Sequence, residues 1–358
     1  MKPVIRRRIP RWLFGALSLL ALAAAAIGVY VYIQLQPPSA EGGEAVIVKI
    51  PSGIGSAEVA SILKEKGLIR NARVYRIYLE VKGVSDRLQA GTYRFAPGTS
   101  LEKITADLVA GNVYRDTIKV TIPEGFRVEQ VAERLEQAGV ANRERFIQAI
   151  QKGDFSNYSF VRQIPAERPL KYRLEGYLFP DTYEIQKDAD ETAIVAMMLE
   201  RLSRELTPER LERLKKLGLS IHDWLTLASL VEREAMVEKE RPVIAGVLWN
   251  RLKKGWPLQV DATIQYVYGK QKERLTHRDL KIDDPYNTYL YKGLPPGPVG
   301  SPGVSSLEAV LFPEEHQYFF YVTKKDGSNE HYFAKTYAEH QQNIALSKRH
   351  QEQRIGNR

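Results

Sequence analysis

The sequence contains no cysteine among its 358 residues. This absence excludes disulfide bridges, thiol nucleophiles, thiolate metal sites and a lipid-modified N-terminal cysteine. It does not assign a compartment, because a domain of ordinary size buries a sufficient core without cross-links. At about 100–200 residues per domain, the length predicts two or three folded units.

Acidic residues are missing from one place, the N-terminus. Residues 1–11 hold five basic side chains and no acidic one, which is more than half of the formal net charge of +9. The other 347 residues carry 47 basic and 43 acidic side chains. That balance is too even for a strong polyanion-binding surface, so we expect no nucleic acid partner.

A long apolar run follows the basic cluster. Residues 12–33 contain no charged side chain, and a helix of that length crosses about 30 Å of hydrocarbon. Trp12 at one end and Tyr30 and Tyr32 at the other are typical of an aromatic belt. We therefore expect a single-pass membrane anchor.

The basic cluster also predicts the orientation of this anchor. Basic residues remain on the cytoplasmic side, so we expect residues 1–11 to form a cytoplasmic tail and residues 34–358 to lie outside. The alternative is a cleaved signal peptide, since residues 21–26 offer small side chains. The apolar run is, however, longer than the 7–15 residues or so that are usual in such peptides.

An internal repeat with a period of 72 residues follows a linker at residues 34–44. The segment VKIPSG at 48–53 recurs as VTIPEG at 120–125. Each copy predicts a short strand, a turn and an amphipathic helix. We assign a LysM-like module to residues 45–115, and a second repeat unit with its connection to residues 116–170. A structural role and glycan binding are both open for these units.

The rest of the chain predicts a larger α+β unit at residues 171–345, followed by a polar tail at 346–358. The chain as a whole is therefore expected to be α+β, with one transmembrane helix, small β-α modules and this larger domain. Residues after 340 are polar and are expected to fray. Within the larger unit we expect helices at 191–206, 208–217, 222–237 and 241–253, and a strand pair at 316–323 and 330–334.

The segment WLTLASLVEREAM at 224–236 carries the strongest chemical signal. At 100° per residue, Glu234 falls on the same helical face as Leu227 and Leu230. Desolvation on an apolar face raises the pKa of a carboxyl group, as a general acid near neutral pH requires. Glu232 points to another side and is a candidate structural group. The alternative for Glu234 is a core carboxylate paired with a Lys or Arg.

Three downstream segments are dense in amides, hydroxyls, aromatic rings and rigid turns. LQVDAT at 258–263, if extended, places Gln259 and Asp261 on one face. DDPYNTY at 283–289 is a polar aromatic loop, and GLPPGPVGSPG at 293–303 suits a rigid wall. Such groups together suit a sugar, although for any single residue a well-packed cluster of turns is the better explanation.

Other chemistries lack their motifs in this sequence. There is no HExxH or comparable ligand spacing, so we expect no metal. No GxSxG elbow, P-loop or GxGxxG follows a predicted strand. We therefore expect no organic cofactor either.

Six segments in order resemble the YceG/MltG family, the membrane-anchored endolytic murein transglycosylases of bacteria. The resemblance covers the anchor, the LysM-like region and the whole C-terminal domain. The family's catalytic residue, the second Glu of a Glu-x-Glu pair, falls on Glu234. In related lytic transglycosylases Ser or Thr follows this Glu, whereas Ala235 follows it here. The segments are EGYLFPDTY from 175, ASLVERE from 228, NRL from 250, LQVDAT from 258, PYNTY from 285 and GLPPGP from 293.

The resemblance implies cleavage of the β-1,4 bond between N-acetylmuramic acid and N-acetylglucosamine within glycan strands. Glu234 would protonate the leaving oxygen and then deprotonate the muramoyl 6-hydroxyl, which leaves a 1,6-anhydro end and terminates nascent strands. Expected partners are the glycan strands, the bacterial inner (cytoplasmic) membrane through residues 12–33, and cell-wall synthases. Our candidates for binding sugar and acetamide are Gln259, Asp261, Tyr286 and Asn287, with Glu175 lining the cleft.

Two other functions remain open at this stage. The first is a non-catalytic, membrane-tethered glycan-binding or scaffolding protein of the cell-wall synthesis machinery. The second is a hydrolase of lysozyme type, which would produce reducing ends in place of anhydro ends.

Overall fold

A computed structural model describes the chain except for residues 1–10, 39–42, 273 and 357–358. It divides into two compact units, Met1–Asp116 and Thr117–Arg358. Both contain helices and small antiparallel sheets, in agreement with the expected α+β class.

The first unit begins with α1 (Arg11–Leu35). The apolar run expected to cross a membrane lies on this helix, and the side chains of residues 12–18 fall outside the described ones, as does the basic cluster at 1–10. Within the described part of the chain, no helix has both the length and the apolar character that a membrane span requires.

The remainder of the first unit is a strand–helix–helix–strand–helix module. Its two strands pair antiparallel with Val48 opposite Tyr93, and their buried side chains share a core with Leu63 and Leu108. Ser100 caps the last helix by accepting a hydrogen bond from the backbone N–H of Lys103 at 3.2 Å. The elements are β1 (Val46–Ile50), α2 (Ser56–Glu65), α3 (Ala72–Lys82), β2 (Gly91–Phe95) and α4 (Leu101–Ala110).

The second unit opens with the same order of elements. The strand–turn–helix start was expected from the repeat, and the structure extends the likeness to the closing strand and helix. Tyr93 and Tyr183 occupy matching strand positions, and each hydroxyl donates to the carbonyl four residues earlier, on Gln89 and Phe179. The connection before the closing strand is longer in this second copy, at residues 153–180, than in the first, at residues 83–90, and the extra length is an insertion. Its elements are β3 (Thr117–Ile122), α5 (Val128–Gln137), α6 (Arg143–Lys152), α7 (Ser159–Arg162, in the insertion), β4 (Asp181–Gln186) and α8 (Glu191–Ser203).

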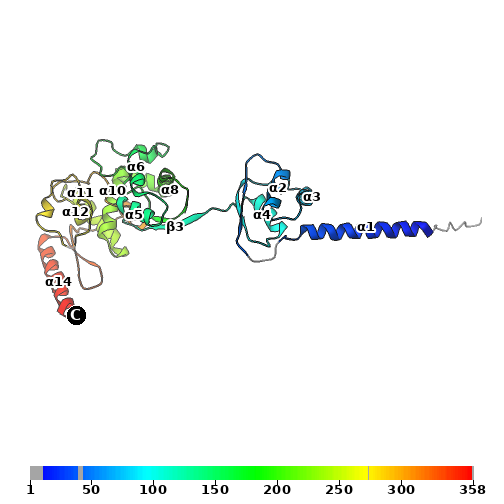
Figure 1. Ribbon diagram of the computed structural model, residues 1–358. Helices are drawn as coiled ribbons and strands as arrows, with labels where there is room; N and C mark the ends of the chain where they lie inside the picture. Colours follow the sequence, from blue (N-terminus) through cyan, green and yellow to red (C-terminus); the bar gives the residue numbers. More distant parts are fainter. Residues whose placement is uncertain (1–10, 39–42, 273, 357–358) are drawn as a thin grey trace, which may run out of the picture. The chain divides into compact units, whose positions relative to one another are not determined.

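The centre of the second unit is α10, which packs against α11, α12 and α13 (Figure 1). Nearly every residue of α10 from Ile221 to Val231 is buried, and its buried polar side chains, His222, Thr226 and Ser229, are hydrogen-bonded within the protein. The remaining elements are α9 (Pro208–Leu217), α10 (Ile221–Glu234), η1 (Glu238–Glu240), α11 (Arg241–Lys253), α12 (Asp261–Tyr268), η2 (Asp279–Lys281), α13 (Val304–Leu311), β5 (Phe320–Thr323), β6 (His331–Ala334) and α14 (Tyr337–Gly356).

Two expectations for this unit are wrong. Residues 258–263 are not one extended segment, because Gln259 has a φ of 51° and a helix begins at Asp261, where an acidic side chain favours a helix N-terminus. The residues after 340 do not fray but continue α14, which packs on β5 and β6. Polar side chains hold this helix: Ser347 donates to the carbonyl of Thr323 at 2.7 Å, and Asn343 to that of Phe333 at 3.3 Å.

Two helices and the strand pair are shorter than expected. The helix from Glu191 ends at Ser203, the strand pair is confined to β5 and β6, and α10 ends at Glu234. At Ala235 the backbone leaves the helix for an extended conformation, with φ −81° and ψ 111°. Glu234 is therefore the last residue of a buried helix, at the point where the chain turns away.

Candidate active site

The carboxyl group of Glu234 lies in a pocket of about 530 Å³ at the C-terminal end of α10. Three further parts of the second unit contribute walls: the start of α12, the loop after it, and the β5–β6 hairpin. The described lining residues are Arg233, Glu234, Met236, Asp261, Ala262, Gln265, Gln271, Lys272, Arg274, Leu275, Leu280, Tyr289, Thr323 and His331. Glu234 as a residue is half-buried, and it is among the residues that line this pocket.

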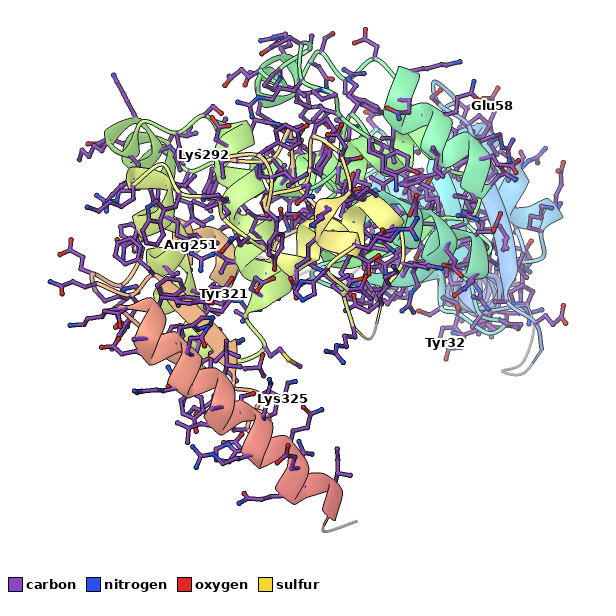
Figure 2. All side chains as sticks on the ribbon, turned by 90° about the vertical axis from the view of Figure 1, so that its left-hand side faces the viewer. Tyr32, Glu58, Arg251, Lys292, Tyr321 and Lys325 are labelled. Atoms are coloured by element: carbon purple, nitrogen blue, oxygen red, sulfur yellow. The ribbon has the colours of Figure 1, made fainter. Side chains whose placement is uncertain are left out.

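A tyrosine from the hairpin orients this carboxyl group. The hydroxyl of Tyr321 donates to Oε2 of Glu234 at 3.0 Å. The Tyr321 ring is packed edge-on against His331, with ring centroids 5.6 Å apart. The guanidinium of Arg251 lies over the same ring, 6.0 Å from its centroid; Tyr321 and Arg251 are both labelled in Figure 2. Arg251 is in turn fixed by hydrogen bonds to the carbonyls of Phe319 and Leu258. The position of Tyr321 is therefore determined by packing on both sides.

Burial raises the pKa of Glu234 to about 7. The negative charge of Asp261 acts in the same direction, whereas the hydrogen bonds from Tyr321 and from the backbone N–H of Ala262 oppose the rise. A carboxyl group with this pKa is close to half protonated at neutral pH. It can therefore give a proton in one step and take one in the next.

Glu232 points away from the pocket, as expected from the helical spacing. Its Oε1 accepts from Arg241 at 2.9 Å, and its Oε2 accepts from the backbone N–H of Gly303 at 3.0 Å and from Ser306 at 2.8 Å. One carboxylate thus joins α10 to the starts of α11 and α13. Glu232 therefore has a structural role, because both of its carboxylate oxygens are bound to groups outside the pocket.

Among the predicted sugar-binding residues, Asp261 is the one that the structure brings to Glu234. Asp261 is the first residue of α12, is exposed, and accepts a hydrogen bond from the hydroxyl of Tyr289. Gln259 is also exposed, but it is not among the described residues that line the pocket.

The other three predicted residues are buried away from the pocket. Asn287 is fully buried, and its amide donates to the carbonyls of Leu280 and Ile282 at 3.1 and 2.7 Å. Tyr286 is 4% exposed and packs on Tyr266 with ring centroids 4.8 Å apart. These two residues shape the loop that carries Tyr289 and do not face the cavity.

Glu175 does not line the cleft, contrary to expectation. It is 1% exposed, and it accepts hydrogen bonds from the backbone N–H of Val128 and from the hydroxyl of Tyr266, both at 3.0 Å. Burial raises the pKa of Glu175 to about 7. Its partners place it in the core, where it fastens the insertion of the second repeat copy to the start of α5.

Sequence reasoning missed Tyr289, Tyr321, Arg251 and His331 as parts of the site. Tyr289 stands in the PYNTY segment, whose polar and aromatic density was the available signal. Tyr321 and His331 lie in the predicted strand pair, but nothing in the sequence connects that pair to a residue about 90 positions earlier. The described residues include no cluster of three or more His, Asp or Glu that could hold a metal.

Comparisons with known proteins give one consistent result. A sequence model of the YceG-like family matches residues 48–346. A Bacillus subtilis (strain 168) protein named endolytic murein transglycosylase is 35% identical over 318 residues, which is 86% of each chain. A Streptococcus pneumoniae (strain D39) protein of the same name is 30% identical over 350 residues, which is 92% of this chain and 63% of that protein. A crystal structure of a YceG-like protein from Listeria monocytogenes superposes with a TM-score of 0.58 at 32% identity, covering 84% of this chain and 98% of that one.

Proposed function

The chain belongs to the YceG-like family, and we propose that it is an endolytic murein transglycosylase, which cleaves peptidoglycan glycan strands from within. The observation that carries this function is Glu234: a carboxyl group that lines a pocket at the end of a buried helix, with its pKa raised to about 7. The 35% identity to a relative of that name supports the same reaction.

In the first step Glu234 acts as the general acid. The protonated carboxyl group gives its proton to the oxygen that links C1 of N-acetylmuramic acid to C4 of N-acetylglucosamine. The C1–O bond then breaks with the electron pair remaining on that oxygen. The Tyr321 hydroxyl holds the carboxyl group in one orientation, so the proton is delivered from a fixed position.

In the second step the resulting carboxylate acts as the base. It removes the proton of the muramoyl 6-hydroxyl, whose oxygen bonds to C1 and forms a 1,6-anhydro ring. No water is consumed and Glu234 is protonated again. A single acid/base residue is enough, since the substrate supplies its own nucleophile. The negative charge of Asp261 in the same pocket favours the positive charge that develops at C1.

Asp261 also supports a second candidate, a hydrolase of lysozyme type. Glycoside hydrolases use two carboxyl groups, one as acid and one as nucleophile or base. Glu234 and Asp261 line one pocket and would provide such a pair. The products separate the two functions, because hydrolysis leaves reducing ends and transglycosylation leaves anhydro ends.

The proposal includes a tether to the bacterial cytoplasmic membrane with the N-terminus inside. It is supported by the five basic side chains of residues 1–11 and by the uncharged run at 12–33. The LysM-like module and the enzyme would then face the cell wall, where glycan strands and their synthases are the available partners.

The direct test is the substitution Glu234→Gln in the full-length chain. Purified glycan strands are digested with either protein, and 1,6-anhydro-muramoyl ends are counted by mass spectrometry. We expect the wild type to generate these ends and Glu234→Gln to reduce the rate by at least about a hundredfold, as for a lost general acid. Glu212→Gln, the same change at an exposed site on α9, is the control. Equal yields from wild type and Glu234→Gln would overturn the proposal.

A further inference from the structure

A second, smaller pocket adjoins the one that holds Glu234. It has a volume of about 120 Å³, the space of a few water molecules at about 30 Å³ each. We call it the basic recess. Both cavities are lined by Arg233, Ala262, Gln265 and Gln271, so the recess opens beside the catalytic carboxyl group. Its described lining residues are Arg127, Gln130, Arg233, Ala262, Gln265, Tyr266, Lys270, Gln271 and Val299.

Three of these side chains are cations: Arg127, Arg233 and Lys270. No acidic residue is among the described ones that line the recess. Arg127 donates to the carbonyl of Gly269 at 2.9 Å, and Arg233 donates to Oε1 of Gln271 at 3.1 Å. Both guanidinium groups are thus held in place by neutral acceptors, and neither forms a salt bridge with a described carboxylate.

Three other partly buried arginines of the same unit bind carboxylates, whereas Arg251 binds backbone carbonyls, as Arg127 does. Arg201 binds Asp181 and Glu205, Arg210 binds Glu205 and Glu308, and Arg241 binds Glu232. Burial and repulsion from the charge of Arg127 both lower the pKa of Arg233, whereas the charges of Glu234 and Glu232 act in the opposite direction. An anion in the recess would relieve this repulsion and satisfy the N–H groups that the neutral acceptors leave free.

We propose that the basic recess binds a carboxylate on the lactyl branch of a muramoyl residue next to the bond that is cleaved. This inference rests on the proposed function. The sugar rings of a peptidoglycan strand are uncharged, and anionic groups enter only on the lactyl branch or on the peptide attached to it. A guanidinium matches a carboxylate geometrically, and the recess has room for that group but not for a sugar ring.

Two sources supply this chemistry. On strands without peptide the lactyl group ends in a free carboxylate, whereas on strands with peptide the carboxylates belong to the peptide. The recess would in either case tell a muramoyl residue from an N-acetylglucosamine residue, because only the former carries the acidic branch. It would thereby fix which sugar places its C1 at Glu234.

The test measures binding, with cleavage blocked by Glu234→Gln in the full-length chain. Soluble glycan fragments are prepared in three forms: with peptides, stripped of peptides by an amidase, and with all carboxylates amidated by carbodiimide and ammonia. Calorimetry compares the Glu234→Gln chain with the same chain carrying Arg233→Gln and Lys270→Gln. The control carries Lys292→Gln, a change of equal charge at an exposed residue, labelled in Figure 2, that lines neither pocket.

We expect amidation to weaken binding of the Glu234→Gln chain about tenfold. The double change should weaken binding to carboxylate-bearing fragments by about the same factor and should have no further effect on amidated fragments. The form with the larger loss, peptide-bearing or stripped, identifies the source. Lys270→Gln alone, at an exposed position, should give a smaller loss in the same direction with an unchanged unfolding temperature.

Equal losses on carboxylate-bearing and amidated fragments, no loss at all, or no binding by the parent chain would each overturn the inference. The proposed function is checked separately, by the anhydro ends that the wild-type chain produces. A wild type that generates those ends while the double change leaves affinity unaltered would refute the recess and leave the reaction intact.

Discussion

Two groups act on the ionisation of Glu234 in opposite directions. The charge of Asp261 raises the pKa of this carboxyl group, and the hydroxyl of Tyr321 lowers it by donating to the ionised form. Because the carboxyl group must be protonated for the first step, kcat/KM of the wild type should fall as the pH rises above about 7.

Substitution of Asp261 or Tyr321 should change the pH at which kcat/KM falls on the alkaline side of its pH profile, which we call the alkaline limb. Asp261→Asn removes the like charge and should move the limb to lower pH, by about half to one pH unit. Tyr321→Phe removes the stabilising donor and should move it to higher pH by a similar amount. The measurement is kcat/KM for anhydro ends between pH 5 and 9. Shifts in the same direction would show that a different group controls the profile.

The raised pKa of Glu234 also has an effect on stability. The folded protein binds this proton more tightly than the unfolded chain does, so the contribution of this one group to stability is greatest below pH 4.5 and falls as the pH rises toward 7. Glu234→Gln removes the ionisation. It should be more stable than the wild type at pH 8, by about 1–3 kcal/mol at roughly 1.4 kcal/mol per pKa unit, and the difference should shrink at pH 4.5.

Urea unfolding at the two pH values measures this difference. Glu212→Gln, at an exposed site, should produce no gain at pH 8. A stabilisation by Glu234→Gln that is the same at both pH values would mean that the carboxyl group is not desolvated as the pocket indicates.

At single positions the sequence shows which polar residues stand in an unusual place, but not whether their side chains face the pocket or the core. Glu234 could be found because helical periodicity places it on an apolar face. Glu175, Tyr286 and Asn287 share the same unusual polarity, but the structure buries all three. Glu175 binds the N–H of Val128 and the hydroxyl of Tyr266, and Asn287 binds the loop carbonyls. Whether a polar group meets a ligand or the core depends on tertiary neighbours, which no local pattern contains.

Among the elements, α10 is joined to the starts of α11 and α13 by one carboxylate. Glu232 is nearly buried and binds Arg241, the N–H of Gly303 and Ser306 at once. Glu232→Ala leaves Arg241 without that partner and should destabilise the second unit by about 3–5 kcal/mol. Urea unfolding checks this value.

The matched control is Glu238→Ala, which removes a carboxylate that binds Ser305 at the surface. It should change stability by less than about 1 kcal/mol. Similar losses for the two variants would show that Glu232 is not a clamp between the helices.

Helix boundaries followed the sequence where capping residues mark them. The helix at 208–217 has Thr207 as N-cap, Pro208 in its first turn and Gly218 in the left-handed conformation at its end. In contrast, α14 is polar and is held by side chains that bind the backbone of the β5–β6 hairpin. Hydropathy carries no signal for such docking, and it was missed for that reason.

The internal repeat could be only partly recognised from the sequence, because an insertion separates the two halves of its second copy along the chain. Its first half is visible because residues 48–67 and 120–139 align at one spacing. The insertion at 153–180 shifts the spacing of the second half, so Tyr93 and Tyr183 are 90 residues apart and their equivalence appears only in the structure.

At the scale of the whole molecule, the two units have separate cores. Every described residue that lines the Glu234 pocket and the basic recess belongs to the second unit. A fragment of residues 117–358 should therefore fold cooperatively and cleave soluble strands, with kcat/KM within about threefold of the full-length chain, as expected for an independent domain.

Thermal unfolding and the release of anhydro ends check this fragment. The fragment with Glu234→Gln should be folded but inactive. A fragment that is folded yet inactive with Glu234 intact would show that the first unit contributes to the site.

The central claim is that Glu234 directs the 6-hydroxyl of the substrate, and not water, to C1. The most direct measurement is digestion of glycan strands by the wild-type chain in water enriched in ¹⁸O, with mass spectrometry of the new ends. We predict anhydro ends without the heavy isotope, in amounts that Glu234→Gln abolishes. Reducing ends that carry ¹⁸O at C1 would contradict the account and assign the pocket to a hydrolase with Asp261 as its second carboxylate.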